Sequence, residues 1–350
     1  MSSSGGCALK AAVYHNHKDI RIEELEEPEI GSDEVLIRVK TCGICGSDVH
    51  LLEGKWAVED ERVIMGHEFS GIVEKKGENV GDLKKGGRVV VDPNIICGSC
   101  YYCRLDTKNY YCSNRKVIGW GGWLNGGFSE LVKAPRNVVY ELPDTVSFEQ
   151  AAMVEPIACA LRGVDNTRIK SGDRVVILGA GSMGLLLLQL VLMAGASSVL
   201  VTDIQGIRLK RATELGADRT INSGNEDVER AVQDATDGIG ADVVFEAAGT
   251  AKTASQTVKL IRRGGKVCLF GVVPQEEFIR IKPFELYYKE ATLVSSFCNP
   301  FTFQRAIELL RNKKINVTGL ITHRYPLADI KSAFKTMLED STRCKVMIEI

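Results

Sequence analysis

An excess of charge of either sign is missing from this sequence. Among its 350 residues, 44 lysines and arginines face 45 aspartates and glutamates, which gives a formal net charge of −1. So neutral a chain has no electrostatic reason to bind nucleic acid or an anionic membrane, and a small, roughly neutral ligand fits better. Disorder is also excluded, because 45% hydrophobic and 25% charged residues are typical of a globular protein, here long enough for two domains.

The N-terminus, MSSSGGCALKAAVY, lacks the basic segment, apolar run and cleavage site of a secretory signal. We therefore expect a cytoplasmic protein. Thiols stay reduced in that compartment, so the eleven cysteines are expected to include metal ligands rather than disulfides.

Charge is also absent from residues 175–202, VVILGAGSMGLLLLQLVLMAGASSVLVT, a stretch long enough to span a bilayer. Gly179, Gly181, Gly184 and Gly195 divide it into a short apolar run, a turn, a run of helix length and another apolar run. We interpret it as a buried strand, helix and strand rather than as a transmembrane helix.

From residue 173 onward, short apolar runs alternate with helical patterns. The predicted strands are 174–178, 198–203, 219–222, 242–249, 266–272 and 292–297, and the predicted helices are 182–195, 207–217, 227–238 and 252–265. This alternation predicts an α/β fold with a doubly wound parallel sheet covered on both faces. The first half, with short strand-like runs between glycine-rich turns, predicts an irregular, mostly β domain.

Three glycines, Gly179, Gly181 and Gly184, form G-x-G-x-x-G between a predicted strand and a predicted helix. The motif alone is weak, but the next strand ends in Asp203, and this order is typical of dinucleotide binding on a helix N-terminus. A carboxylate there accepts hydrogen bonds from the ribose and repels a 2′-phosphate, which predicts NAD. Arg208 could pair with such a phosphate, although its plainer roles are an exposed helix residue or a cover for the adenine.

Cys97, Cys100, Cys103 and Cys112 fall within sixteen residues, so four thiolates can close tetrahedrally on one zinc ion. Such a shell has no open position, which predicts a structural site. The alternatives are thiols in a loop or a redox role.

A catalytic zinc needs three protein ligands and an open fourth position. The candidates are scattered: Cys42 and Cys45 in CGICGSDVH, His67 and Glu68 in MGHEFSG, and Glu155 in AAMVEPIACA. Each is weak when taken singly, and a buried, hydrogen-bonded histidine is the commoner fate of a residue such as His67. Spacing alone cannot bring together ligands so far apart in sequence.

Taken together, CGICGSDVH, GHEFSGIV, the four-cysteine lobe, GGFSELV, GAGSMG and VEPIACAL resemble the zinc-dependent medium-chain alcohol dehydrogenases, over nearly the full length. The chain is most similar to their sorbitol dehydrogenase branch, which acts on sorbitol, xylitol, arabinitol and other polyols. The resemblance implies a GroES-like zinc-binding catalytic domain at 1–157 and 297–350 and a Rossmann NAD-binding domain at 158–296. It also implies an active site in the cleft between the domains.

The resemblance further assigns roles within CGICGSDVH. It implies that Cys45 and His67 bind the catalytic zinc, that Glu68 or Glu155 supplies a carboxylate directly or through water, and that Cys42 has no role. Ser47 and His50 match the family's proton relay, although a capping serine and a surface histidine are the plainer readings of these two residues. Further cofactor contacts implied by the resemblance are Ser182, Met183, Val272 and Phe297.

The implied activity is oxidation of a secondary hydroxyl of a polyol to a ketone, with zinc and NAD as cofactors. Threonine dehydrogenase is the rival within the same superfamily, and a non-catalytic scaffold that binds zinc and nucleotide is the alternative of another class. The family also implies a homo-oligomer, either a tetramer or a dimer.

Overall fold

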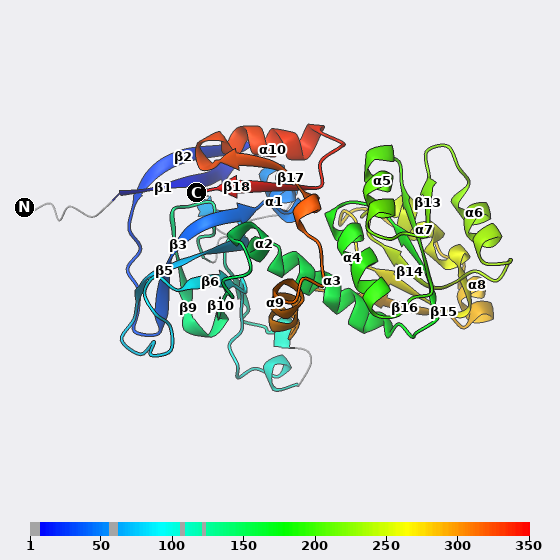
Figure 1. Cartoon of the computed structure of the whole chain (residues 1–350), viewed down its shortest axis with the longest axis horizontal. Coiled ribbons are helices and arrows are strands. Elements are labelled where there is room, and N and C mark those ends of the chain that lie inside the picture. The colour runs from blue at the N-terminus through cyan, green and yellow to red at the C-terminus, as the bar shows by residue number, and fades with distance from the viewer. Residues whose placement is uncertain (1–7, 56–61, 106–108, 121–123) are drawn as a thin grey trace, which may run out of the picture. The chain divides into compact units, whose positions relative to one another are not determined.

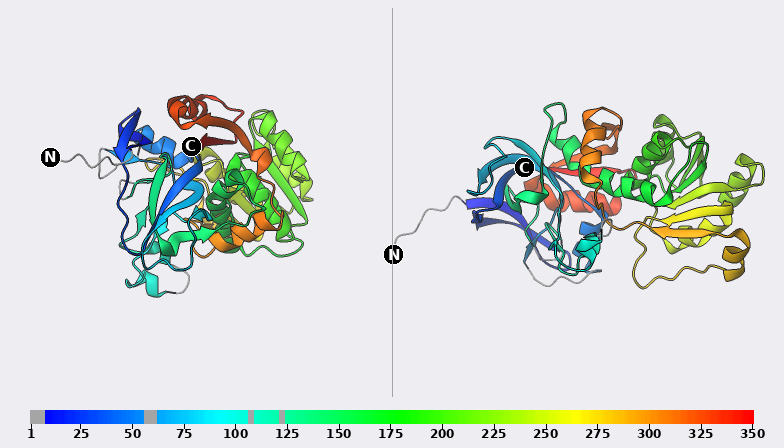
Figure 2. Two further views of the ribbon diagram at one scale, coloured as in Figure 1. Left: turned by 60° about the vertical axis from the view of Figure 1, so that its left-hand side comes forward. Right: turned by 90° about the horizontal axis from the view of Figure 1, so that it is seen from below.

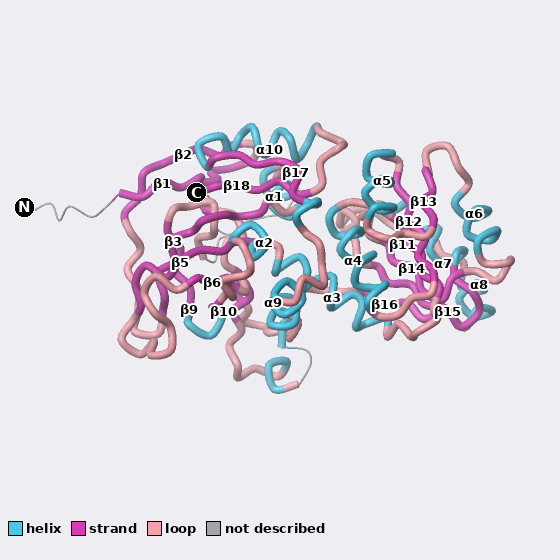
Figure 3. The backbone as a smooth tube through the Cα atoms, in the orientation of Figure 1, coloured by secondary structure: helices cyan, strands magenta, loops and turns pink. Residues whose placement is uncertain are grey.

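A computed structural model describes residues 8–55, 62–105, 109–120 and 124–350. Two compact units are present, Met1–Glu155 with Phe303–Ile350, and Pro156–Thr302 (Figure 1). The first unit is built mainly of strands, whereas strands and helices alternate in the second (Figure 3). The mixed α/β fold predicted from the sequence is therefore confirmed, while the exact domain limits stay a prediction.

The second unit contains one parallel sheet flanked by helices. Its elements are α3 (Val154–Thr167), which begins in the first unit, β11 (Arg174–Leu178), α4 (Ser182–Met193), β12 (Ser198–Asp203), α5 (Gly206–Glu214), β13 (Arg219–Asn222), α6 (Val228–Ala235), β14 (Ala241–Glu246), α7 (Ala251–Leu260), β15 (Ile261–Leu269), α8 (Pro283–Lys289) and β16 (Thr292–Ser295).

The six strands lie in the order β13-β12-β11-β14-β15-β16, and every neighbouring pair is parallel. Helices lie against both faces of this sheet (Figure 2). On one face, Val176 and Leu178 of β11 share an apolar cluster with Val232 of α6 and Val258 of α7. This order reverses direction between β11 and β14, the point where doubly wound sheets bind nucleotides.

The run predicted as a helix at 252–265 is corrected in its second half. α7 ends at Leu260, and Ile261–Leu269 forms β15, whose Ile261 pairs with Ala241 before a register shift. Gly264 has φ +70, a left-handed conformation, so the glycines mark an irregularity within the strand rather than a helix cap. Within the described ranges, no helix is long and apolar enough to cross a membrane.

The first unit holds most of the antiparallel strands. Its elements are β1 (Ala8–Asn16), β2 (Asp19–Glu26), β3 (Glu34–Gly43), α1 (Gly46–Leu52), β4 (Val63–Ile64), β5 (Glu68–Lys76), β6 (Arg88–Val91), β7 (Asn94–Ile95), η1 (Tyr102–Arg104), η2 (Asn109–Tyr111), β8 (Lys116–Val117), β9 (Leu131–Pro135), η3 (Arg136–Val138), β10 (Val139–Glu141), α2 (Phe148–Ala152), α9 (Phe303–Arg311), η4 (Thr318–Leu320), β17 (Ile321–Pro326), η5 (Leu327–Asp329), α10 (Ile330–Glu339) and β18 (Lys345–Glu349).

The central sheet of this unit joins distant parts of the chain. Its order is β10-β6-β5-β3-β18-β17, and β9 also pairs with β3. Strand β3 is antiparallel both to β5, where Gly43 faces Glu68, and to β18, where Gly43 faces Met347. The start of β5 and the C-terminal strand are therefore held close to the end of β3.

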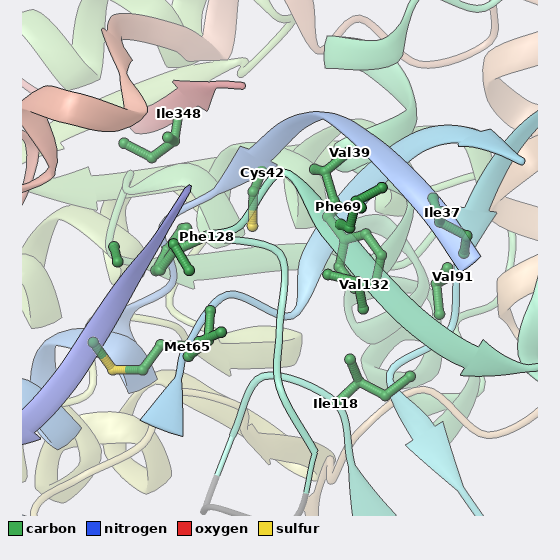
Figure 4. Close-up of a cluster of buried hydrophobic side chains, with 14 of the residues drawn as sticks. Ile37, Val39, Cys42, Met65, Phe69, Val91, Ile118, Phe128, Val132 and Ile348 are labelled. Carbon is green, nitrogen blue, oxygen red and sulfur yellow. The ribbon is translucent and has the colours of Figure 1, made fainter. Parts of the chain in front are cut away.

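Cys42 lies in the core of the first unit. Its side chain is fully buried in a cluster that includes Val39, Phe69, Phe128 and Ile348 (Figure 4). Burial, followed by the charge of Asp48, raises the pKa of this thiol well above its usual value. Cys42 is therefore a packing residue.

Candidate functional site

The glycine turn after β11 is shaped by close backbone contacts. Gly179 has φ +106, and a Cβ atom there would lie 2.8 Å from the amide nitrogen of Ala248. At Gly184 a Cβ would lie 1.8 Å from the carbonyl oxygen of Gly179. Neither position accepts a side chain. Gly179 lets the loop after β14 approach the turn, and Gly184 lets helix α4 pack against it.

Gly181 differs because a Cβ there would have no atom within 4 Å. It caps the N-terminus of α4, whose first-turn N–H groups favour an anion, so the open space fits a pyrophosphate. Ser182 and Met183 lie in that first turn and are half-buried. Elsewhere in this unit, Val272 follows β15 and Phe297 follows β16, and their side chains are 60% and 49% exposed.

Asp203, at the end of β12, holds the turn through its carboxylate. Oδ2 accepts a hydrogen bond from the Ala180 N–H at 2.8 Å, and Oδ1 accepts one from the Gln205 N–H at 2.9 Å. An Arg208 nitrogen lies 3.8 Å from Oδ2. Asp203 thus orders the glycine turn and still has lone pairs for a ribose hydroxyl.

The four lobe cysteines form one cluster in which the four sulfur atoms lie within 4.8 Å of one another. The sulfur atoms of Cys97 and Cys103 are 3.9 Å apart, and those of Cys100 and Cys103 are 3.5 Å apart. Around a tetrahedral zinc with Zn–S bonds of ~2.3 Å, sulfur atoms lie about 3.8 Å apart. None of these cysteines forms a disulfide, so the cluster fits a structural zinc.

Backbone N–H groups favour the thiolate at two of the four lobe cysteines, Cys97 and Cys100. The N–H of Ser99, together with its hydroxyl group and the N–H of Cys100, lowers the pKa of Cys97 to about 5. Burial raises the pKa of Cys103 to about 12 in the absence of metal. Residues 106–108, part of the eight-residue spacing before Cys112, lie outside the described residues.

A second group of donor atoms comes together where β3 ends and β5 begins. Cys45, His67 and Glu68 place one ligand atom each within 4.8 Å of the others. Cys45 is half-buried at the N-cap of α1, while His67 and Glu68 are buried at the start of β5. One sulfur, one nitrogen and one oxygen make an incomplete tetrahedral shell.

Asp48 contacts two of the candidate ligands, Cys45 and His67, a role that the sequence alone did not indicate. Its Oδ2 accepts a hydrogen bond from the Cys45 N–H at 2.8 Å, and its Oδ1 lies 3.5 Å from Nδ1 of His67. Because Asp48 faces Nδ1, Nε2 of His67 is the nitrogen left for a metal ion. The signal that could have found it is an acidic residue three positions after Cys45, in the first turn of α1.

The electrostatics of His67 support this arrangement. Burial alone would lower the pKa of His67, but the negative charges of Asp48 and Cys45 raise it well above the usual value. The surroundings of this imidazole therefore favour a positive charge, which a metal ion would supply. Such a buried acceptor, facing a thiol and a carboxylate, fits a zinc ion.

Lys345 is the second residue that the sequence did not indicate. Its Nζ donates to both carboxylate oxygens of Glu68, at 2.8 and 2.6 Å. Burial acts to lower the pKa of Lys345, but the charges of Glu68 and Cys45 raise it above its usual value. Lys345 belongs to no sequence motif, and its position as the first residue of a strand gives no indication of a role.

Glu155, the other candidate carboxylate, lies in the first turn of α3 and is half-buried. It does not belong to the group of ligand atoms within 4.8 Å, although its charge acts on Lys345. The structure therefore brings Glu68, rather than Glu155, into reach of Cys45 and His67.

Ser47 and His50 lie three residues apart on α1, so their side chains occupy neighbouring positions on one side of the helix. The Oγ of Ser47 is buried and makes no hydrogen bond within the described part of the chain. Burial, followed by the charge of Lys55, lowers the pKa of His50. A hydroxyl group with unused hydrogen-bonding capacity and a neutral imidazole fit the transfer of a proton.

Comparison with known proteins agrees with this geometry. Residues 31–144 match the alcohol dehydrogenase GroES-like domain, and residues 182–312 match the zinc-binding dehydrogenase family. Sorbitol dehydrogenase from Bacillus subtilis (strain 168) is 32% identical over 345 residues, which cover 97% of each chain. The chain belongs to the zinc-dependent medium-chain alcohol dehydrogenases.

Two further members of this family are similar over nearly their whole length. D-arabitol-phosphate dehydrogenase from Enterococcus avium is 36% identical over 93% of this chain and 92% of its own. The crystal structure of a zinc-binding dehydrogenase from Sinorhizobium meliloti 1021, bound to NADP, has a TM-score of 0.93 at 36% identity and covers 98% and 99% of the two chains. The resemblance stated from the sequence is confirmed, and the chain is a zinc-dependent alcohol dehydrogenase.

We expect Cys100→Ser to reduce the zinc content from two ions per chain to one and to lower the thermal midpoint by several degrees. The reason is that binding of a structural zinc contributes directly to folding. Metal analysis and calorimetry measure both effects. Cys159→Ser, which changes a cysteine outside the lobe, is the control and should keep two zinc ions. Retention of both ions by Cys100→Ser would contradict a zinc site in the lobe.

Proposed function

We propose that this enzyme oxidises a secondary hydroxyl of an open-chain polyol to the ketone and transfers the hydride to NAD. The observation that carries the proposal is the incomplete donor set of Cys45, His67 and Glu68, which leaves a fourth position for a substrate oxygen. The polyol class is supported by the similarity to sorbitol dehydrogenase and D-arabitol-phosphate dehydrogenase.

Zinc held by these residues would polarise the hydroxyl oxygen and lower its pKa. The chain supplies the rest of the proton path. The buried Oγ of Ser47, which has no other partner in the described chain, would accept the hydroxyl proton while releasing its own proton toward the nicotinamide ribose. His50, neutral at pH 7 because its pKa is lowered, takes the proton onward to water.

NAD is favoured over NADP by the carboxylate of Asp203, which is 8% exposed beside the glycine turn. The negatively charged 2′-phosphate of NADP would lie next to this carboxylate, and the repulsion between the two groups would weaken NADP binding. Arg208 is the opposing feature, since its Nε is buried without a hydrogen-bond partner in the described residues. The S. meliloti relative was crystallised with NADP, so both cofactors belong in the test.

The test is a substrate screen read as NADH or NADPH absorbance, with sorbitol, xylitol, arabinitol, arabinitol phosphate, inositol and L-threonine. We expect turnover of an unphosphorylated polyol with NAD. Cys45→Ser should abolish that turnover and leave NAD affinity nearly unchanged, because Cys45 lies in the other unit from the glycine turn. Turnover of threonine alone would replace the polyol proposal, and cofactor binding without turnover of any compound would favour a scaffold.

The relay predicts a dependence on pH. His50 must be neutral to accept a proton, and its pKa lies below the 6.5 of an unperturbed histidine, so kcat should fall only as the pH drops through that lowered value. His50→Asn should lose this acid limb and reduce kcat about a hundredfold, the lower end of what a general acid–base group contributes. His17→Asn, at an exposed histidine, is the control and should keep the wild-type profile. An unchanged acid limb in His50→Asn would remove His50 from the proton path.

We also propose that two copies pair through the edge of the parallel sheet. Strand β16 ends the strand order, and its residues are mostly exposed. Helix α8, which contacts the neighbouring strand β15, exposes Phe284, Tyr287 and Tyr288 by 68%, 82% and 56%. An unpaired edge beside exposed aromatic side chains is typical of a surface that a second copy covers.

Leu293→Lys, within β16, should shift the enzyme toward monomers in sedimentation experiments, because a lysine on an edge strand disfavours pairing. Ile239→Lys is the matched control, since Ile239 is 56% exposed in the turn after α6. An unchanged oligomeric state in Leu293→Lys would place the interface elsewhere.

A further inference from the structure

The ion pair between Lys345 and Glu68 is buried at the candidate catalytic metal centre. Lys345 is 3% exposed and Glu68 is 1% exposed. The ammonium group contacts both carboxylate oxygens and lies 3.3 Å from the carbonyl oxygen of Ile44. Both groups have lost their water, so each depends on the other for its hydrogen bonds.

Stability does not explain this pair. Removing two charges from water costs several kcal/mol per ion, and well-packed apolar residues often serve a core equally well. The carboxylate concerned also belongs to the group of donor atoms formed with Cys45 and His67. The ammonium group is thus attached to a candidate metal ligand, where it changes how that ligand binds.

The backbone fixes the pair from two sides. Lys345 opens β18 and Glu68 opens β5, and both strands pair with the end of β3. A Cβ atom at Gly43 would lie 2.3 Å from Oε2 of Glu68, so the carboxylate fills the space that a side chain there would need. Glu68 is therefore held between the glycine and the lysine.

We propose that Lys345 is a positioning residue that competes with the metal ion for the carboxylate of Glu68. The proposal rests on the function proposed above, with zinc at Cys45, His67 and Glu68. Each carboxylate oxygen has a second lone pair, so Glu68 can contact the ion while it accepts hydrogen bonds from Lys345. The ammonium group draws electron density from those oxygens, which weakens Glu68 as a ligand and leaves more of the ion's positive charge for a substrate oxygen at the open fourth position.

The test compares Lys345→Met with wild type in the zinc-loaded enzyme and after cobalt exchange into the more labile site. Without the ammonium group, Glu68 should bind the ion more firmly. Zinc release to a chelator should slow about tenfold. Removal of other outer partners weakens metal binding by ~10- to 100-fold, and the sign is reversed here because Lys345 competes with the ion. The visible cobalt bands should weaken, because both oxygens of Glu68 can then bind the ion and raise its coordination number, and kcat should fall.

A double-mutant cycle assigns these effects to Glu68. In the Glu68→Gln background, Lys345→Met should change zinc release and the cobalt spectrum little, because the competing carboxylate is gone. Lys345→Gln keeps an N–H donor without a charge. Its rate of zinc release and its cobalt spectrum should therefore lie between those of wild type and Lys345→Met. It also serves if Lys345→Met folds poorly. Faster zinc release in both lysine variants, or equal effects in both backgrounds, would overturn the proposal.

Wild-type measurements separate this proposal from the proposed function. If the wild-type enzyme holds a single zinc or oxidises no polyol, the proposed function fails before any variant is made. If it holds two zinc ions and oxidises a polyol, but the cycle shows no coupling, the role of Lys345 alone is refuted.

Discussion

Antiparallel pairing of β3 with β5 on one side and β18 on the other is the constraint on which the candidate metal centre depends. It brings together a cysteine just beyond β3, a histidine and glutamate at the start of β5, and a lysine at the start of β18. These residues are separated by as many as 300 positions in the chain. The centre exists only when this sheet has formed, so its ligands are positioned by the same long-range contacts that build the core.

Sequence alone predicted the features that local patterns determine. The glycine turn is followed within one strand by Asp203, and the four lobe cysteines lie within sixteen residues, so their geometry follows from short stretches of chain. The alternation of strands and helices gave the parallel sheet in the same way. The predicted end of α7 was wrong. Two basic residues followed by two glycines, at 262–265, are typical of the end of a helix, but pairing with β14 makes them part of strand β15.

The donor group of Cys45, His67 and Glu68 could not be derived in this way. Spacing left Cys42 and Cys45 as equal candidates, and only packing shows that Cys42 lies in the apolar core. Lys345 carries no local signal, since its partner lies 277 residues away. Asp48 was within reach of a sequence argument, because an acid three residues into a helix commonly contacts the capping residue.

Charge balance links these residues to the chemistry. With a zinc ion bound, the positive charges of the ion and of Lys345 would equal the negative charges of Cys45, Asp48 and Glu68. A balanced centre can be buried at moderate cost, but it offers little excess positive charge to a substrate oxygen that is losing its proton. A weakly held Glu68 resolves this conflict. Because the charge of Glu68 would be shared with Lys345, the ion would keep more of its positive charge for a substrate oxygen at the open fourth position.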